Sequence, residues 1–281
     1  MLANWPLDPL VLSGLPAAGI VYVRADRRVR GDRRGRPLRR RSFLAGLAVV
    51  FVALQSPIDE GAATSFAVHM VQHLLLTMVA APLLVLGAPV TLALQATTPR
   101  RRRRILSTLR SAPARLLSTP IAAWSLFVAV LWGTHFTALY ELTLRSSGIH
   151  ALEHLVYLAT ALLFWIPVVG LDPAPAGLSH PARIRYLFQA MPAMAFLGRV
   201  LFSADRVLYP TNAVVEGASR ALADQRVAGA LMWTGTMFLI VPALGFVLLD
   251  WMRADDRAAR HVDARLLRSR ARAAIADRPL P

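Results

Sequence analysis

Residues 69–89 read HMVQHLLLTMVAAPLLVLGAP, which places two histidines near one end of an apolar run long enough to cross a bilayer. His69 and His73 are four residues apart, so both side chains fall on the same face of a helix. Ionisable side chains within a membrane helix are costly and mark functional sites. We therefore expect the rest of the chain to position this histidine pair.

The composition is that of a membrane protein with several spans. Of the 281 residues, 56% are hydrophobic and 17% are charged, and the mean hydropathy is +0.47. A soluble domain of this size carries fewer apolar and more charged residues. The formal charge of +16 is confined to a few segments between apolar runs, which is typical of topology signals and of contacts with lipid phosphates. This segregation argues against nucleic acid as a partner.

Two residue types are absent from the sequence, and each absence excludes a class of site. All 32 basic residues are arginine, so no lysine can form the Schiff base of a retinal protein. The sequence also has no cysteine, which excludes disulfides, thiolate metal ligands and covalent c-type haem attachment.

Seven apolar runs predict an all-α, polytopic membrane protein. A seven-transmembrane-helix bundle is expected at residues 1–252, followed by an arginine-rich cytoplasmic tail at 253–281. Of the arginines, 27 fall in four segments assigned to the cytoplasm, and five fall elsewhere. By the positive-inside rule, the N-terminus is outside and the C-terminus is cytoplasmic. The expected spans are residues 7–23, 42–56, 64–86, 120–139, 148–169, 186–202 and 227–251.

Three further features are expected from this topology. Pro82 should kink the third span in its inner half. Residues 203–226 form the longest outer connection, and a loop of that length is usually functional or partly ordered. The tail after Trp251 is expected to form a frayed interfacial helix on the cytoplasmic side.

Five of the seven histidines are expected at one depth near the outer face. They are His69 and His73 on the third span, His135 on the fourth, and His150 and His154 on the fifth. Neutral imidazole is the commonest protein ligand for first-row transition metals, and an i, i+4 pair can bind one ion from a single helix. The five histidines are therefore the predicted metal ligands.

Other polar side chains are expected near this histidine layer. Glu153 could orient an imidazole through a hydrogen bond or ligate directly. Gln72, Asp59 and Tyr157 are further polar candidates, and Met70 supplies a thioether. Without a thiolate, imidazole with an optional thioether suits copper in either oxidation state and also accepts zinc.

These residues also have a structural interpretation. A single histidine on a membrane helix is often an interhelical hydrogen-bond donor. Met78, Met191 and Met194 can be core residues, although Met191 and Met194 could also pass Cu(I) onward. His180 and His261 lie on the cytoplasmic side, outside the layer. Geometry decides between the interpretations, since imidazoles that share an ion should approach within about 4 to 5 Å of one another.

Several motifs occur in a fixed order along residues 55–250. PID (57–59) precedes HMVQHLLL, APLL and GAP; WGTH (132–135) and YE (140–141) come next; and HALEHLVY (150–157) leads into FWIP (164–167). YP (209–210), LADQ (222–225), AG (228–229) and MW (232–233) come last. Together they resemble the CtaG-like, copper-related cytochrome c oxidase assembly factor family of bacteria. Two departures are Phe136 where a proline is expected and Glu141 where an aspartate often stands.

The resemblance implies a multi-pass protein of the bacterial plasma (inner) membrane that acts as a chaperone of the respiratory chain and not as an enzyme. It implies a role in cytochrome c oxidase assembly, through delivery of copper to the dinuclear centre of an extracytoplasmic subunit domain. Expected partners are oxidase subunits or a soluble copper donor, docked on residues 203–226, together with membrane lipids.

Two alternatives from other classes stay open. A copper transporter or permease requires ligands that continue inward, where only scattered methionines such as Met78 and Met191 are available. A b-type haem protein would use axial histidines from two helices, although i, i+4 pairs suit a compact ion better than a macrocycle. An intramembrane protease is disfavoured because no serine stands in a Gly-x-Ser-x-Gly setting and the clustered histidines have no nucleophile beside them.

Overall fold

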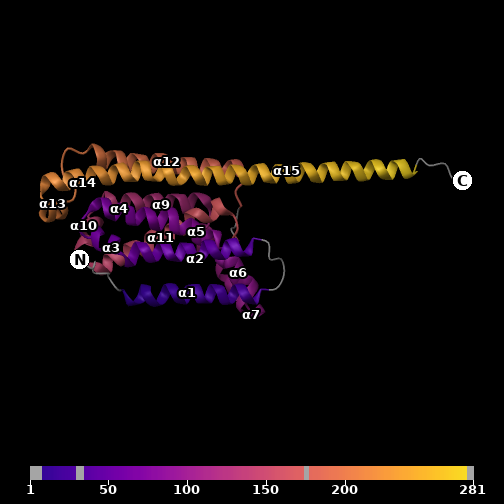
Figure 1. Cartoon of the computed structure of the whole chain (residues 1–281), viewed down its shortest axis with the longest axis horizontal. Coiled ribbons are helices and arrows are strands. Elements are labelled where there is room, and N and C mark those ends of the chain that lie inside the picture. Colours follow the sequence, from indigo (N-terminus) through magenta and orange to yellow (C-terminus); the bar gives the residue numbers. More distant parts are fainter. Residues whose placement is uncertain (1–7, 30–34, 174–176, 277–281) are drawn as a thin grey trace.

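The computed structural model describes residues 8–29, 35–173 and 177–276 as a bundle of helices (Figure 1). The structure is 87% helical, and the residues that it describes contain no strand. The all-α prediction is therefore confirmed. Residue 7 of the first expected span, residues 30–34 of the first arginine-rich segment, residues 174–176 of the loop after the fifth span and residues 277–281 of the tail lie outside the described residues.

Helix starts are set by local sequence. Several helices begin with proline in the first turn, where the missing N–H costs nothing. Side chains of Asp8, Ser56, Ser65, Thr119 and Ser146 cap helix N-termini. The helices are α1 (Pro9–Arg28), α2 (Arg36–Gln55), α3 (Pro57–Ala62), α4 (Phe66–Leu74), η1 (Leu75–Ala80), α5 (Ala81–Leu86), α6 (Pro89–Ala96), α7 (Pro99–Leu109), α8 (Ala112–Leu117), α9 (Pro120–His135), α10 (Leu139–Arg145), α11 (Ser147–Val169), α12 (His180–Ser203), α13 (Pro210–Glu216), α14 (Ala218–Ala230), η2 (Leu231–Gly235) and α15 (Thr236–Ala276).

Each of the seven expected spans coincides with a long helical segment in the described residues. Among the described residues, three helices could cross a membrane by length and apolar composition: residues 66–96, 147–169 and 218–264. A fourth results if α9 and α10, which are bent by 69° at their junction, count as one span. Several apolar helices could thus span a membrane.

The third expected span contains a π-helical turn directly before its proline. Residues Leu75–Ala80 form the π-helix η1 between α4 and α5, and Pro82 lies in the first turn of α5. Proline cannot donate a backbone hydrogen bond, and a neighbouring wide turn is one way for a helix to accommodate that loss. The sequence predicts a kink at Pro82, and the structure has a π-helical segment directly before this proline.

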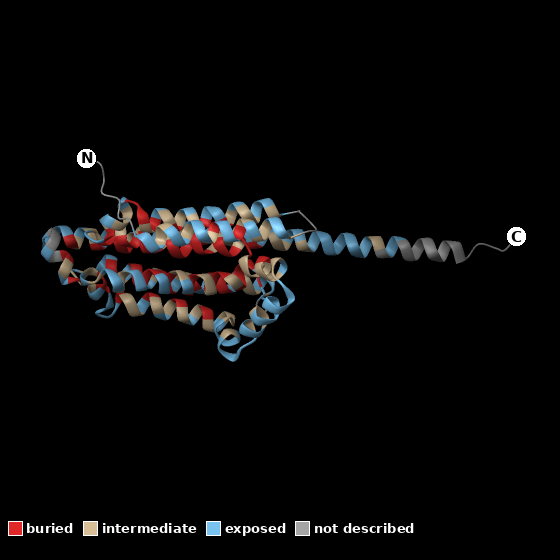
Figure 2. Cartoon of the chain, turned by 90° about the horizontal axis from the view of Figure 1, so that it is seen from below, coloured by how far each residue is buried: buried red, intermediate tan, exposed pale blue. Residues whose placement is uncertain are grey.

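The connection at residues 203–226 is more ordered than a loop. It contains α13 and most of α14, and α14 continues through η2 into α15. The last long helix therefore begins at Ala218 rather than Val227. At its other end, α15 continues to Ala276 and projects well past the bundle, with exposed residues on its described outer part (Figure 2).

The two ends of the bundle differ in charge. One end carries α3, α10 and α13, and the opposite end carries α6 and α7 (Figure 1). Arg100–Arg104 on α7 are exposed at the second end. At the same end, the hydroxyl of Tyr22 on α1 donates a 2.6 Å hydrogen bond to the carbonyl of Gly87 and so ties α1 to the segment before α6. The arginines of α15 extend beyond that same end (Figure 1).

Candidate metal site

The candidate site lies between α4 and α11. His69 and His73 project from α4, while His150, Glu153 and His154 project from α11. Positions i, i+3 and i+4 fall on one helix face, so the His-x-x-Glu-His motif presents all three side chains toward α4.

The start of α4 is held by a carboxylate from a distant helix. Asp224 on α14 accepts hydrogen bonds from the backbone N–H of Phe66, at 2.5 Å, and from the Ser65 hydroxyl, at 2.9 Å. A carboxylate at a helix N-terminus satisfies free N–H groups and complements the helix dipole. Because His69 lies one turn after Phe66, Asp224 fixes the position of the first imidazole.

α14 can deliver Asp224 because it packs backbone to backbone on α12. A Cβ atom on Gly229 would lie 2.5 Å from the amide nitrogen of Phe202, and one on Gly198 would lie 2.7 Å from the carbonyl oxygen of Gly229. Small residues permit such close approach between membrane helices. The AG motif at residues 228–229 thus sets the distance between these two helices.

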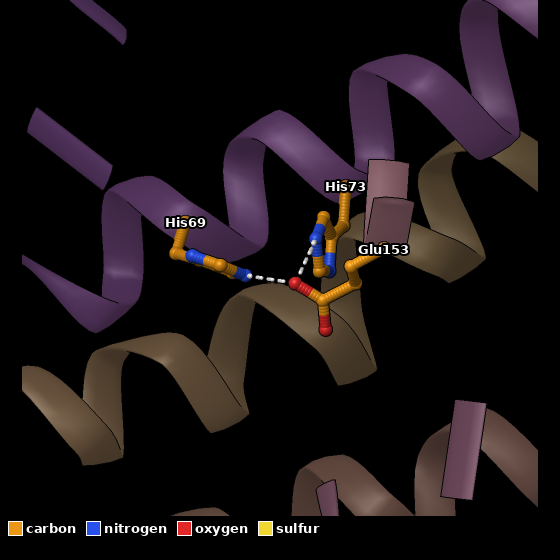
Figure 3. Close-up of side chains that lie close together, drawn as sticks. All are labelled: His69, His73 and Glu153. Atoms are coloured by element: carbon orange, nitrogen blue, oxygen red, sulfur yellow. Dashed lines mark ion pairs between the residues drawn. The ribbon is translucent and has the colours of Figure 1, made fainter. Parts of the chain in front are cut away.

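Glu153 points between the two imidazoles of α4 (Figure 3). Its Oε2 lies 3.5 Å from Nε2 of His69 and 3.7 Å from Nε2 of His73. One ligand atom from each of the three residues can be chosen so that all lie within 4.8 Å of one another. The imidazole rings of His69 and His73 have centroids 4.3 Å apart, which meets the distance expected of a shared site.

These three side chains are buried without hydrogen-bond partners. His69 is 0% exposed, His73 5% and Glu153 7%. Both ring nitrogens of each histidine and both carboxylate oxygens lack a hydrogen bond, since neither Glu153 contact has suitable geometry. An unsatisfied buried polar group costs about 1 to 3 kcal/mol, and a charged group costs more. A cation bound by one atom of each residue would satisfy three of these six atoms at once, so the residues fit a metal ion.

Two further imidazoles flank the group. The ring of His150 stacks on that of His69 with centroids 5.0 Å apart, and the ring of His154 lies 5.7 Å from that of His73. His150 and His154 also lie side by side, at 4.2 Å. Four of the five predicted histidines are therefore gathered around Glu153.

A hydrogen-bond chain fixes the orientation of His154. The Gln72 amide nitrogen donates to the carbonyl of Ala53, at 2.8 Å, and to Oδ1 of Asp59, at 2.6 Å. The Gln72 oxygen must therefore face Nε2 of His154, 3.1 Å away, and that nitrogen must carry the proton. Only Nδ1 of His154 is left with a free lone pair. Gln72 and Asp59 thus hold an imidazole in place, as expected of residues that support a metal ligand.

A groove lies beside two of the histidines, His150 and His154. It has a volume of about 430 Å³, and polar side chains line it from the exposed Asp8 through Gln55 and Asp59 to His150 and His154. Burial raises the pKa of Asp59, which lies on α3 at the end of the bundle, while the hydrogen bond from Gln72 opposes this shift. The groove thus reaches His150 and His154, which flank the site, whereas His69, His73 and Glu153 do not line it.

The comparisons with known proteins identify a family for the chain. The family model described as "Cytochrome c oxidase caa3 assembly factor (Caa3_CtaG)" matches residues 20–254. The chain belongs to this family. Uncharacterised proteins of Mycobacterium bovis and Mycobacterium tuberculosis are each 30% identical to it over 279 residues, which cover 94% of this chain. The chain spans 42% of the length of these curated relatives. No solved structure matches the chain.

Membership of the Caa3_CtaG family confirms the resemblance seen in the motifs. The family is described as an assembly factor of the caa3-type cytochrome c oxidase. Within the family's matched region lie all five candidate histidines, Glu153 and the capping residue Asp224.

His135 stands apart from the other four histidines. Its Nδ1 lies 2.7 Å from the carbonyl oxygen of Leu131, and its Nε2 lies 3.3 Å from Sδ of Met70. It is not part of the group formed by His69, His73 and Glu153. The sequence predicts that Met70 lies near the histidine layer, and in the structure its sulfur contacts His135.

Two residues have larger roles in the structure than the sequence indicates. The sequence predicts that Glu153 supports or ligates, and the structure places its carboxylate between both α4 imidazoles. Asp224 belongs to the LADQ motif, to which the sequence assigns no role, and it caps α4 from 158 residues away in the chain. No signal in the sequence around Asp224 distinguishes it from a surface carboxylate, since Gln225 and Arg226 follow it directly.

Proposed function

We propose that this Caa3_CtaG protein binds a transition-metal ion between α4 and α11 and delivers copper during cytochrome c oxidase assembly. The observation that carries the proposal is the set of buried, unpartnered ligand atoms of His69, His73 and Glu153. A purely structural histidine would be expected to make the interhelical hydrogen bond that these residues lack.

The separations suit one ion. With metal–ligand bonds of about 2.0 to 2.1 Å, the two distances from Glu153 to the imidazoles correspond to angles of about 115 to 130° at the metal, which extend somewhat beyond the trigonal angle of about 120°. His150, with its Nε2 buried and unpartnered, and His154, through Nδ1, supply further nitrogen ligands. Imidazole and carboxylate together suit Cu(II) and also accept zinc.

The proposed topology places this site near the outer face. The proposal keeps seven spans, with the N-terminus outside and the C-terminus cytoplasmic, because the exposed arginines of α7 and α15 gather at the end opposite α3, α10 and α13. The groove begins at Asp8 and Asp59, at the outer end. An extracytoplasmic oxidase subunit or a soluble copper donor would then meet the groove and residues 203–226 from the same side.

Metal analysis of purified protein tests the proposal. We expect wild-type protein loaded with Cu(II) to retain about one ion at this site, and the His69→Ala and His73→Ala variants to lose affinity at least tenfold. His180→Ala and His261→Ala are the matched controls, since both histidines lie on the opposite side of the proposed topology.

Several results would count against the proposal. Copper retained equally by the His69→Ala, His73→Ala and wild-type proteins would contradict it. A reduced-minus-oxidised spectrum with a haem band would favour a b-type haem protein instead. Copper uptake into sealed vesicles that contain the pure protein would favour a transporter over a delivery factor.

A further inference from the structure

A cavity that adjoins the Glu153 group is lined by methionine sulfur and imidazole. It lies where α4, α9, α11, α12 and η2 meet, and its chemistry-bearing side chains are Met70, His73, His135, Tyr157, Met194 and Met232. The three methionines are buried, with exposures of 1%, 2% and 3%. His73 is shared with the group around Glu153, so the two sites are adjacent.

The protonation of His135 is determined by its contacts. The Leu131 carbonyl oxygen, 2.7 Å from Nδ1, can only accept a hydrogen bond, so Nδ1 carries the proton. Nε2 of the neutral ring then has a free lone pair. This arrangement, with one ring nitrogen donating to a backbone carbonyl, is the usual one for a metal-ligating histidine.

The free lone pair of His135 faces another electron-pair donor. Sδ of Met70 lies 3.3 Å from Nε2, and a thioether has no proton to donate. Two lone pairs directed at each other in a buried position gain nothing from that contact. A cation that binds both atoms would convert the contact into a favourable one.

From these contacts we propose that the cavity is a binding site for a soft monovalent cation, Cu(I), held by the His135 nitrogen and the Met70 sulfur. With bonds of about 2.0 Å to nitrogen and 2.3 Å to sulfur, the observed separation corresponds to an angle of about 100° at the ion, which calls for further ligands. Met194 and Met232 line the same cavity and supply them. Thioether sulfur selects Cu(I) over zinc, whereas the carboxylate of Glu153 favours harder ions.

The local backbone is suited to such a site. Met232 lies on the π-helix η2, and His73 precedes the π-helix η1 by two residues. π segments within α-helices occur frequently at functional sites. The proposal stands on its own ligand atoms and does not require the Glu153 group to hold an ion.

Silver binding by the full-length purified protein tests this site, because Ag(I) is a redox-inert stand-in for Cu(I). We expect wild-type protein to bind Ag(I) and the Met194→Leu/Met232→Leu double variant to bind it at least tenfold more weakly. Leucine is close to methionine in volume, so the fold should persist. Met78→Leu is the matched control, since Met78 is buried in the same core but does not line the cavity.

X-ray absorption of the Cu(I)-loaded protein gives a second readout, with a sulfur shell expected in wild type and lost in the double variant. The proposal is overturned if wild type binds no Ag(I), if the double variant binds it as tightly as wild type, or if Met78→Leu weakens binding equally. Failure of the Glu153 site is distinguishable: Glu153→Gln should abolish Zn(II) binding and leave Ag(I) binding within threefold of wild type.

Discussion

Glu153 is a carboxylate held without a hydrogen bond between two imidazoles, and this makes its contribution to stability depend on the metal. In metal-free protein a buried charge without a hydrogen bond is destabilising, whereas with a cation bound the same charge is a ligand. The carboxylate therefore opposes folding in one state and supports it in the other.

A single substitution should reveal this reversal. We expect Glu153→Gln to raise the melting temperature of the metal-free protein and to remove stabilisation by Zn(II), which in wild type should be about 2.7 kcal/mol at a hundredfold excess over Kd. Thermal unfolding with and without Zn(II) measures both effects. Glu60→Gln, an exposed carboxylate at the same end, should change neither. A lower metal-free melting temperature for Glu153→Gln would assign it a structural role instead.

Asp59 gives a pH-dependent prediction. Burial raises its pKa in the folded protein, so the folded state favours the protonated acid and stability falls as the pH rises from the unfolded pKa through the folded one. Asp59→Asn cannot ionise and keeps an oxygen for Gln72. Its melting temperature should therefore exceed that of wild type by a margin that grows between pH 4 and pH 7. A margin that shrinks over this range would show that the ionised carboxylate is stabilising.

At the scale of elements, α4 depends on a cap supplied by α14. Asp224 accepts hydrogen bonds from Ser65 and from the backbone N–H of Phe66, so the first turn of α4 and the position of His69 rest on it. We expect Asp224→Ala to cost about 1 to 2 kcal/mol of unfolding free energy and to weaken metal binding. Denaturant unfolding and Cu(II) titration measure the two effects.

The control for this prediction is Asp205→Ala. Asp205 lies in the segment before α13, its side chain is fully exposed, and its ion pair with Arg226 is long, at 3.8 Å. Such surface pairs contribute little. Equal losses in the two variants would indicate a general electrostatic effect and would remove Asp224 from the support of α4.

The contact between α12 and α14 is a second test at this scale. A Cβ atom on Gly229 would meet backbone atoms of α12, which cannot move without shifting a helix, so Gly229→Ala should destabilise the protein by about 1 to 3 kcal/mol. Gly245→Ala on α15 is the matched control, because a Cβ atom there meets nothing within 4 Å. Helix propensity alone would make both changes neutral or stabilising, so an equal response would refute the close contact.

At the scale of the whole molecule, the absence of cysteine allows a direct test of topology. Val214 on α13 is 86% exposed at the end with α3 and α10, and Arg101 on α7 is exposed at the other end. In intact spheroplasts a membrane-impermeant maleimide should label Val214→Cys and leave Arg101→Cys unlabelled until the membrane is permeabilised. The opposite pattern would invert the proposed topology and move the metal site to the cytoplasmic end.

The sequence by itself determined the features that depend on local chemistry and periodicity. Apolar runs predicted where each long helix lies, and the i, i+4 spacing put His69 and His73 on one face, because helix geometry is set within a few residues. Ordered motifs predicted the Caa3_CtaG family, which the match to residues 20–254 confirms. The connection at 203–226 is partly ordered, as expected, but the last long helix begins at Ala218 and not at Val227, since propensity does not register the partners that stabilise a helix.

Only the tertiary structure decided which histidine side chains lie close enough to share an ion. Depth along a helix carries no information about rotation around it, so five histidines at one level could not be sorted by sequence. Packing turned His150, Glu153 and His154 toward α4, and it turned His135 toward Met70. The cap from Asp224 and the cavity shared by His73 likewise depend on contacts between helices far apart in the chain. Long-range packing, which no local pattern encodes, therefore separates the single predicted histidine layer into a carboxylate–imidazole group and a thioether–imidazole cavity.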